Sequence, residues 1–167
     1  MEDSLVESIV QVCYILNEHS VEYLIVGGTA VGFHGFSRRS RTSSGKVAEK
    51  YDLDFWYNPT YKNYYNLLDA LEQLGKDVSE FRAETTPDPK QSFFRFEFDR
   101  FTIDFLPDLP GLSKFRRSYN AREVSKLKET KIDFISYDDL IENKKTQGRP
   151  KDIEDIKELE KRRSNPG

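Results

Sequence analysis

The chain has 167 residues, a length that suggests one domain. Hydrophobic residues make up 37% and aromatic residues 13%, which is enough for an apolar core and excludes a largely disordered chain. The net charge of -3 argues against a general nucleic-acid binder, because binding to phosphate backbones usually needs a surplus of basic residues.

The cysteine content and the distribution of apolar residues exclude further classes of protein. The single Cys13 excludes an intrachain disulfide framework and a zinc site of paired cysteines, and its position predicts a small core residue. No stretch approaches the roughly 20 apolar residues that span a membrane. The acidic N-terminus, Met1–Ser4, lacks the basic start and apolar run of a signal peptide, so we expect a cytoplasmic protein without membrane contact.

Apolar spacing and turn residues predict the elements of the first half of the chain. Asp3 or Ser4 is expected to cap the first helix, and Thr60 is expected to cap the helix that ends at Gly75. The predicted elements are, in order, a helix around Leu5–Leu16, a strand over Tyr23–Val26, a short helix over Thr29–His34, a loop over Phe36–Lys50, a strand over Tyr51–Tyr57 and a helix around Tyr64–Leu74 that ends at Gly75.

The second half is predicted to contain a hairpin, a further strand and a helical end. In order, we expect a polar loop with one helical turn over Lys76–Gln91, a strand over Phe93–Phe98, a tight turn at Asp99–Arg100, a strand over Phe101–Leu106, a break over Pro107–Gly111, a helix over Phe115–Val124, a strand over Lys131–Ile135 and two helices from about Tyr137 and Pro150. This mixture of strands and helices indicates an α/β or α+β domain.

Two carboxylates lie on one predicted strand. Because strand side chains alternate between faces, Asp52 and Asp54 share one face while Leu53 and Phe55 point into the core. Neighbouring carboxylates repel each other unless a cation lies between them, and their oxygens suit Mg²⁺ or Mn²⁺. A solvated strand face is the plain alternative. A second strand, with Asp104 between large apolar neighbours, favours a metal site over that alternative.

The turn Gly27-Gly28-Thr29 is an independent feature, since it follows an apolar strand and opens a short helix. Two glycines let the backbone approach a ligand closely, and a helix N-terminus presents free N–H groups to an anion. Thr29 adds a hydroxyl donor. The alternative is a plain strand-to-helix turn. Neither a dinucleotide-binding fingerprint nor a Walker A motif is present.

The order of these features resembles the nucleotidyltransferase superfamily typified by DNA polymerase beta and the antibiotic nucleotidyltransferases. In the superfamily and in this chain, a glycine turn is followed by a strand with two acids and then by a strand with a third acid. The chain is also similar, over about Tyr23–Leu159, to small bacterial nucleotidyltransferase-like proteins related to the minimal and AbiEii-type toxin–antitoxin members. The segments that carry this second likeness are Gly27–Val31, His34-Gly35, Arg41-Thr42, Ile135-Ser136, Asp139–Ile141, Lys144, Gly148–Asp152 and Asp155.

The resemblance implies a nucleotidyltransferase fold of the α/β (α+β) class, with a mixed β-sheet flanked by helices and a C-terminal helical segment. We expect a single domain over residues 1–167. An N-terminal helix would fall within residues 1–20, the catalytic core within 21–136 and the C-terminal helices within 137–163.

The resemblance also implies a role for individual residues. Asp52, Asp54 and Asp104 would be the catalytic residues and the metal ligands, with Mg²⁺ or Mn²⁺ as the cofactor. A part in deprotonating the acceptor is sometimes proposed for the third carboxylate of this family. The implied nucleotide-binding residues are Gly27, Gly28, Thr29, Arg41, Lys144 and Lys151.

One departure from the family pattern is an insertion. Relatives of this kind place the two-acid strand directly after the Arg-Thr pair, whereas Ser43–Tyr51 intervenes here. The insertion would be either a flap over the nucleotide or an inert surface loop. Arg38, Arg39 and Arg149 are further candidates for contacts to phosphate or acceptor, whereas Trp56 and His34 are expected to be structural.

The implied activity is metal-dependent transfer of a nucleoside monophosphate from an NTP, with ATP expected, to a hydroxyl group. The acceptor would be a protein, an RNA such as tRNA or a small molecule, and a toxin–antitoxin system with a cognate partner protein is one setting. The alternative is a non-catalytic member of the fold that binds nucleotide or a partner as an antitoxin. Three carboxylates and the glycine turn favour the enzyme, since a binding module does not need them.

Overall fold

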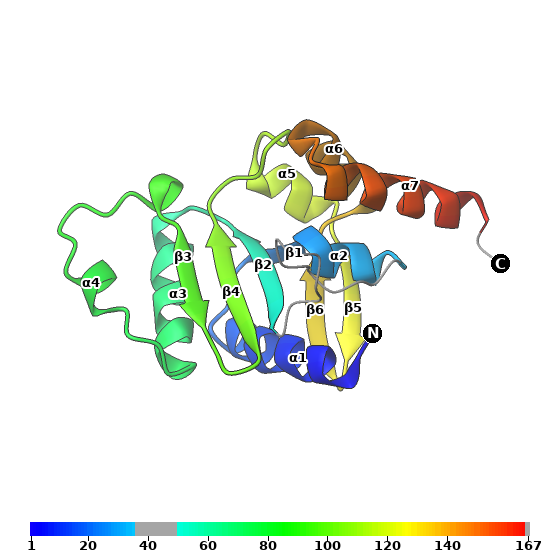
Figure 1. The fold of residues 1–167 in the computed structure, drawn as a ribbon. Coiled ribbons are helices and arrows are strands. Elements are labelled where there is room, and N and C mark those ends of the chain that lie inside the picture. Colours follow the sequence, from blue (N-terminus) through cyan, green and yellow to red (C-terminus); the bar gives the residue numbers. More distant parts are fainter. Residues whose placement is uncertain (36–49, 166–167) are drawn as a thin grey trace.

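A six-stranded mixed β-sheet forms the centre of the protein (Figure 1). The computed structural model describes residues 1–35 and 50–165. The strands are β1 (Tyr23–Val26), β2 (Tyr51–Tyr57), β3 (Phe94–Glu97), β4 (Phe101–Leu106), β5 (Glu123–Leu127) and β6 (Thr130–Phe134). The helices are α1 (Asp3–Glu18), α2 (Gly27–Phe33), α3 (Tyr61–Gln73), α4 (Ser79–Arg82), the 3-10 turn η1 (Pro89–Gln91), α5 (Phe115–Asn120), α6 (Tyr137–Gln147) and α7 (Pro150–Ser164).

The strand order in the sheet is β3-β4-β2-β1-β6-β5. The pairs β2–β4 and β1–β6 are parallel, and the pairs β1–β2, β3–β4 and β5–β6 are antiparallel. The architecture is therefore the mixed sheet with flanking helices and a helical C-terminal segment that the sequence predicted.

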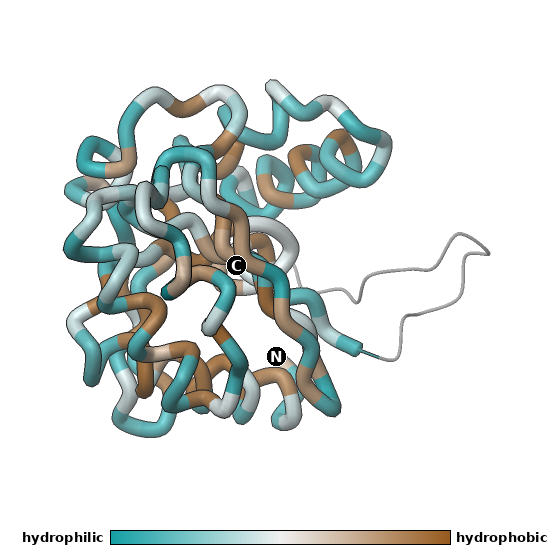
Figure 2. Tube along the Cα trace, turned by 90° about the vertical axis from the view of Figure 1, so that its left-hand side faces the viewer, coloured by the Kyte–Doolittle hydropathy of each residue, from teal (hydrophilic) through white to brown (hydrophobic). Residues whose placement is uncertain are grey.

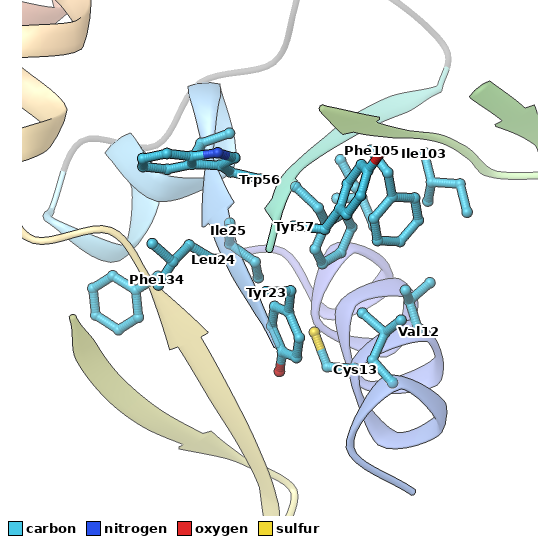
Figure 3. Packing of buried hydrophobic residues seen from close by; sticks show 14 of the residues in the cluster. Val12, Cys13, Tyr23, Leu24, Ile25, Trp56, Tyr57, Ile103, Phe105 and Phe134 are labelled. Carbon is cyan, nitrogen blue, oxygen red and sulfur yellow. The ribbon is translucent and has the colours of Figure 1, made fainter. Parts of the chain in front are cut away.

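The two faces of the sheet are covered differently. Phe55 stacks on Phe105, and Phe94 at the edge of the same face contacts Tyr64 of α3. Figure 3 shows Cys13 of α1 beside this face. The opposite face carries alternate residues of β2, and α5 covers only part of it. That incomplete cover leaves room for a cavity over the centre of the sheet.

The buried apolar residues form a single cluster that includes the central strands. Trp56 and Cys13 are almost fully buried, at 1% and 0% exposure, as their positions predicted. Figure 2 shows apolar residues concentrated along the inner strands and polar residues towards the periphery. No helix in the described part of the chain has the length and apolar content needed to cross a membrane.

The predicted strands β1 and β2 have the expected bounds, and the two C-terminal helices begin at Tyr137 and Pro150 as expected. Thr60 caps α3 by accepting a hydrogen bond from the backbone of Asn63, which confirms the predicted cap. Gly75 follows this helix with φ 89°, a conformation that favours glycine.

Three local predictions are wrong. The helix predicted over Phe115–Val124 ends at Asn120, and Glu123–Leu127 forms the edge strand β5. β5 buries no residue, so pairing with β6 creates it and its own sequence shows no strand pattern. The short helix α2 begins at Gly27, two residues earlier than predicted. The first helix includes Asp3 and Ser4, and its N-cap residue is Glu2, without a side-chain cap.

Candidate active site

Asp52, Asp54 and Asp104 lie on two adjacent strands in the centre of the sheet. β2 and β4 are parallel, and their register places Asp54 directly opposite Asp104. Adjacent strands lie about 4.8 Å apart, so the two side chains project next to each other from the same face. The three side chains, here called the acid face, therefore meet as the sequence predicted.

Asp54 lies in the middle of the acid face, and its ionised form is disfavoured there. Burial and the neighbouring charges of Asp104 and Asp52 raise its pKa to about 6. Lys151 and Lys144 act in the opposite direction. A raised carboxyl pKa means that the ionised form is disfavoured in the folded protein, and a bound cation would relieve that cost.

Gly27 makes room for Asp54. A Cβ atom at Gly27 would lie 2.5 Å from Oδ2 of Asp54, and its φ of +65° already disfavours other residues. At Gly28, by contrast, a Cβ would meet nothing within 4 Å, so this glycine borders open space. Of the two, Gly27 is required by the protein itself, whereas Gly28 leaves space that a ligand can use.

Asp52 is the most exposed of the three acids and is held by two threonines. Thr102 of β4 donates a hydrogen bond of 2.7 Å to its Oδ1. Thr29 of α2 lies 3.4 Å from its backbone carbonyl oxygen, which links the glycine turn to β2. Thr29, for which the sequence predicted a nucleotide contact, lines the cavity.

Asp104 is paired with Arg95 of β3. Nε of Arg95 lies 2.8 Å from Oδ1 and Nη2 lies 2.9 Å from Oδ2, a bidentate ion pair. The arginine side chain is 65% exposed and the carboxylate 18%. Pairing with Asp104 raises the pKa of Arg95 further above its usual value, with smaller contributions from Asp54 and Asp52. Both oxygens of the third carboxylate are therefore engaged.

A cavity of about 1090 Å³ opens over the acid face. One wall is the sheet with its three carboxylates and the glycine turn. The other is the junction between α6 and α7, where Figure 1 shows the two helices meeting above the sheet. The lining residues from that junction are Asn143, Lys144, Gln147, Arg149, Pro150, Lys151, Glu154 and Asp155.

Lys144 is a buried ion-pair partner in this second wall. Its side chain is 3% exposed, and its ammonium lies 3.3 Å from Asp152 and 3.1 Å from Asp155, which are themselves buried. Burial disfavours the charge of Asp152. Hydrogen bonds from Arg149 and the charge of Lys144 outweigh this effect and hold the pKa of Asp152 below its usual range. Lys144, for which the sequence predicted a nucleotide contact, lines the cavity, and its ammonium is paired with these two carboxylates.

The turn between the helices, here called the α6–α7 corner (residues 147–151), carries the cations that face the cavity. Gly148 ends α6 with φ 61°, and Pro150 starts α7. Arg149 lies between them, pairs with Asp152 at 2.6 Å and keeps 47% of its side chain exposed. Lys151 is exposed and also lines the cavity. These two side chains can meet an anion lying above the acid face.

The remaining predicted residues fall into two groups. Arg41 and most of the insertion, up to residue 49, lie outside the described residues, as do Arg38 and Arg39. His34 donates a hydrogen bond of 2.9 Å from Nε2 to the carbonyl of Ile135, the structural role expected for it.

The arrangement of the sheet and its helices matches solved structures. The antibiotic-resistance factor ANT(2'')-Ia has a TM-score of 0.57 at 17% identity, over 95% of this chain and 84% of that one. The lincomycin-bound structure of the lincosamide antibiotic adenylyltransferase LnuA has a TM-score of 0.53 at 15% identity, over 96% of this chain and 97% of that one. The chain has a nucleotidyltransferase fold. No family model and no curated protein sequence matches it.

The donor atoms of the acid face fit Mg²⁺ or Mn²⁺, which bind carboxylate oxygens and waters. The nucleotidyltransferase fold brings the acids together, but not as a ready-made cage. Within residues 1–35 and 50–165, no three acidic, histidine or cysteine side chains are grouped so that they could hold a metal ion as they stand. Arg95 also occupies one lone-pair site on each oxygen of Asp104, which leaves fewer for an ion.

Arg95 is the site residue that the sequence analysis did not identify. The turn predicted at Asp99–Arg100 fixes which residues of the hairpin face each other, and this pairing identifies Arg95. A two-residue turn in this hairpin pairs Phe98 with Phe101, and counting back places Arg95 opposite Asp104, as the register shows. Asn143 and Gln147 also line the cavity, but their position depends on the packing of α6 against α7, for which the sequence contains no comparable signal.

Proposed function

We propose that the protein is a metal-dependent nucleotidyltransferase that transfers a nucleoside monophosphate from an NTP to a small-molecule hydroxyl. The observation that carries the proposal is the acid face, where three carboxylates of two paired strands project into one cavity beside a glycine turn. A protein that only binds a partner has no need to hold three like charges together at the expense of stability.

The two walls of the cavity suggest how a nucleotide would lie. The triphosphate would run between the open space at Gly28 and the cations Arg149 and Lys151, and its α-phosphate would lie over Asp52 and Asp54. ATP is the expected donor. The likeness to ANT(2'')-Ia and LnuA, named for antibiotic resistance and for adenylyl transfer to a lincosamide, supports a small molecule as the acceptor.

The reaction is a displacement at phosphorus. An acceptor oxygen forms a bond to the α-phosphorus, the bond from that phosphorus to the bridging oxygen of the β-phosphate breaks, and pyrophosphate leaves. Bound Mg²⁺ would activate the acceptor oxygen and neutralise the charge of the leaving group. Asp52, Asp54 and Asp104 would hold it.

The residues of the chain contribute position and charge. Asp54 interacts with both of the other acids and would hold the metal together with them, and Gly27 leaves room for its side chain. Asp104 has both oxygens paired to Arg95, so it would have to part from the guanidinium before it could act as a metal ligand or accept a proton. We assign it a ligand role, with the proton of the acceptor hydroxyl passing to solvent.

A transfer assay tests the proposal directly. The protein is incubated with each NTP, Mg²⁺ and a panel of hydroxyl-bearing compounds that includes lincosamides, and pyrophosphate release is measured together with the mass of each compound. We expect one NTP and one class of acceptor to give pyrophosphate and a nucleotidylated product, and the variant Asp54→Asn to give neither. A wild-type protein that binds nucleotide but modifies no acceptor in a panel extended to proteins and tRNA would indicate the non-catalytic alternative. A toxin–antitoxin setting stays a prediction from the family resemblance.

A further inference from the structure

Arg95 holds the third carboxylate from the edge of the sheet. β3 and β4 are antiparallel, and Arg95 lies directly opposite Asp104 in their register. The two contacts, of 2.8 and 2.9 Å, engage one oxygen each. An ionised carboxylate has about four lone-pair sites, and a bidentate guanidinium occupies two of them, one on each oxygen. Asp104 is thus neutralised by a cation of the chain itself.

We propose that Arg95 is a positioning residue that competes with a divalent cation for Asp104. The inference rests on the proposed metal-dependent function. A guanidinium and a metal ion repel each other when they share one carboxylate, so full coordination by Asp104 requires the guanidinium to turn away. Arg95 therefore sets the affinity of the acid face for metal and decides when the third ligand becomes available.

The structure offers the displaced guanidinium a second place. Arg95 lines the main cavity and also a second groove of about 580 Å³. That groove is lined by Asp77 and Glu80, which can accept a cation, and by Phe93. The Phe93 ring centroid is already 5.4 Å from the guanidinium carbon, within the range of a cation–π contact.

The exposure of the pair makes such a movement feasible. The arginine side chain is 65% exposed, so its departure from Asp104 leaves no buried charge on the arginine side. An exposed ion pair contributes little to stability, because water screens its charges, so a bound divalent ion can displace it. In contrast, the buried pairs of Lys144 on the facing wall cannot open without exposing two desolvated carboxylates.

Direct titration with Mn²⁺ tests the competition without any turnover. Free Mn²⁺ is measured by electron paramagnetic resonance during titration of the full chain, for wild type, Arg95→Ala and Arg95→Lys. We expect Arg95→Ala to bind Mn²⁺ more tightly, by on the order of fivefold, because the competing charge is gone. Arg95→Lys keeps the charge but loses the two-pronged contact, so its affinity should lie between those of the other two proteins.

Two controls separate competition from a general change in charge. Arg116→Ala removes another arginine–carboxylate pair, in which Nη2 of Arg116 lies 2.8 Å from both oxygens of Glu22, outside the cavity lining, and should leave Mn²⁺ affinity within about twofold of wild type. In the background Asp104→Asn, the gain from Arg95→Ala should disappear, because the ligand that Arg95 blocks is no longer present.

Each outcome decides between the claims. If wild type binds Mn²⁺ and Arg95→Ala binds it no more tightly, the competition is refuted while the metal site stands. If the gain persists in Asp104→Asn, a general field effect explains it and the positioning role is refuted. If neither wild type nor Arg95→Ala binds Mn²⁺, the proposed metal dependence fails along with the inference. Binding by Arg95→Ala alone would support the inference most strongly.

Discussion

The two walls of the cavity both concentrate charge, but they do so in opposite ways. In the wall formed by α6 and α7, Lys144 is 3% exposed between Asp152 and Asp155, at 0% and 1%, so each charge has a buried partner. On the sheet, Asp52 and Asp54 lie side by side on one strand face with Asp104 next to them. There, three like charges lie together, and of the three only Asp104 is paired with a cation of the described residues, the exposed Arg95.

This contrast separates charges that stabilise the packing of two helices from charges that can bind a ligand. A buried ion that is fully paired fixes the angle between two elements, and it offers little to a ligand. A group of half-exposed like charges destabilises the fold that holds it, and such groups occur where a ligand supplies the missing charge. The sequence predicted nucleotide binding for both Lys144 and Lys151, and both line the cavity, but Lys144 is paired with buried carboxylates whereas Lys151 is exposed.

The largest effect is expected in the paired wall. Lys144→Met removes the buried cation that Asp152 and Asp155 share and should lower the free energy of unfolding by about 3–5 kcal/mol. Urea denaturation followed by circular dichroism measures this. Lys145→Met, at an exposed position of the same helical turn, should change it by less than about 0.5 kcal/mol. Equal stability of both variants would show that the network does not hold the two helices together.

In the acid face, we expect a substitution to reduce activity without lowering stability. Asp54→Asn removes a proposed metal ligand and should reduce nucleotidyl transfer by on the order of 10²–10³-fold. Its melting temperature without metal should equal or exceed that of wild type, because burial and two like charges disfavour the carboxylate. Asp108→Asn, at an exposed position after β4, is the matched control for both measurements. A marked loss of stability in Asp54→Asn would make the acid structural and weaken the contrast.

The two glycines of the turn sharpen the comparison. Gly27→Ala places a Cβ 2.5 Å from Asp54 at a positive φ, and should cost about 1–3 kcal/mol of stability. Gly28→Ala meets no atom within 4 Å and should leave stability within about 0.5 kcal/mol of wild type. If the triphosphate passes over Gly28, as proposed, this second variant should bind ATP more weakly. Unchanged ATP affinity in Gly28→Ala would move the triphosphate elsewhere.

The smallest effect is expected at the exposed cation of the α6–α7 corner. Lys151→Met should weaken ATP binding about fivefold, the equivalent of roughly 1 kcal/mol for one solvated charge contact, without a change in stability. Fluorescence titration with a labelled ATP analogue measures it. Lys157→Met, on the same helix and outside the cavity lining, is the control. Identical affinities of the two variants would contradict a phosphate-binding role for this corner.

Much of this arrangement could be predicted from the sequence, because local patterns encode it. Alternation on β2 indicated that Asp52 and Asp54 share a face, and the cap at Thr60 and the start at Pro150 depend on residues within a few positions. The strand β5 could not be predicted, since it buries no residue and forms by pairing with β6. A pattern of apolar residues carries no information on such an edge.

Other features depend on contacts between distant segments. That Asp54 faces Asp104 follows from parallel pairing of β2 with β4, which are joined through α3, α4 and β3. That Lys144 is buried follows from the packing of α7 on α6. Arg95 is an intermediate case, because the length of the hairpin turn alone sets its position opposite Asp104.

Isothermal titration of ATP tests most directly whether the acid face is a metal-dependent nucleotide site. The account predicts heat of binding in the presence of Mg²⁺, and a loss of the Mg²⁺-dependent part in Asp52→Ala, whose exposed side chain can be removed without disturbing the core. ATP affinity that is the same with Mg²⁺ and with a chelator, or no binding with any divalent ion, would contradict it.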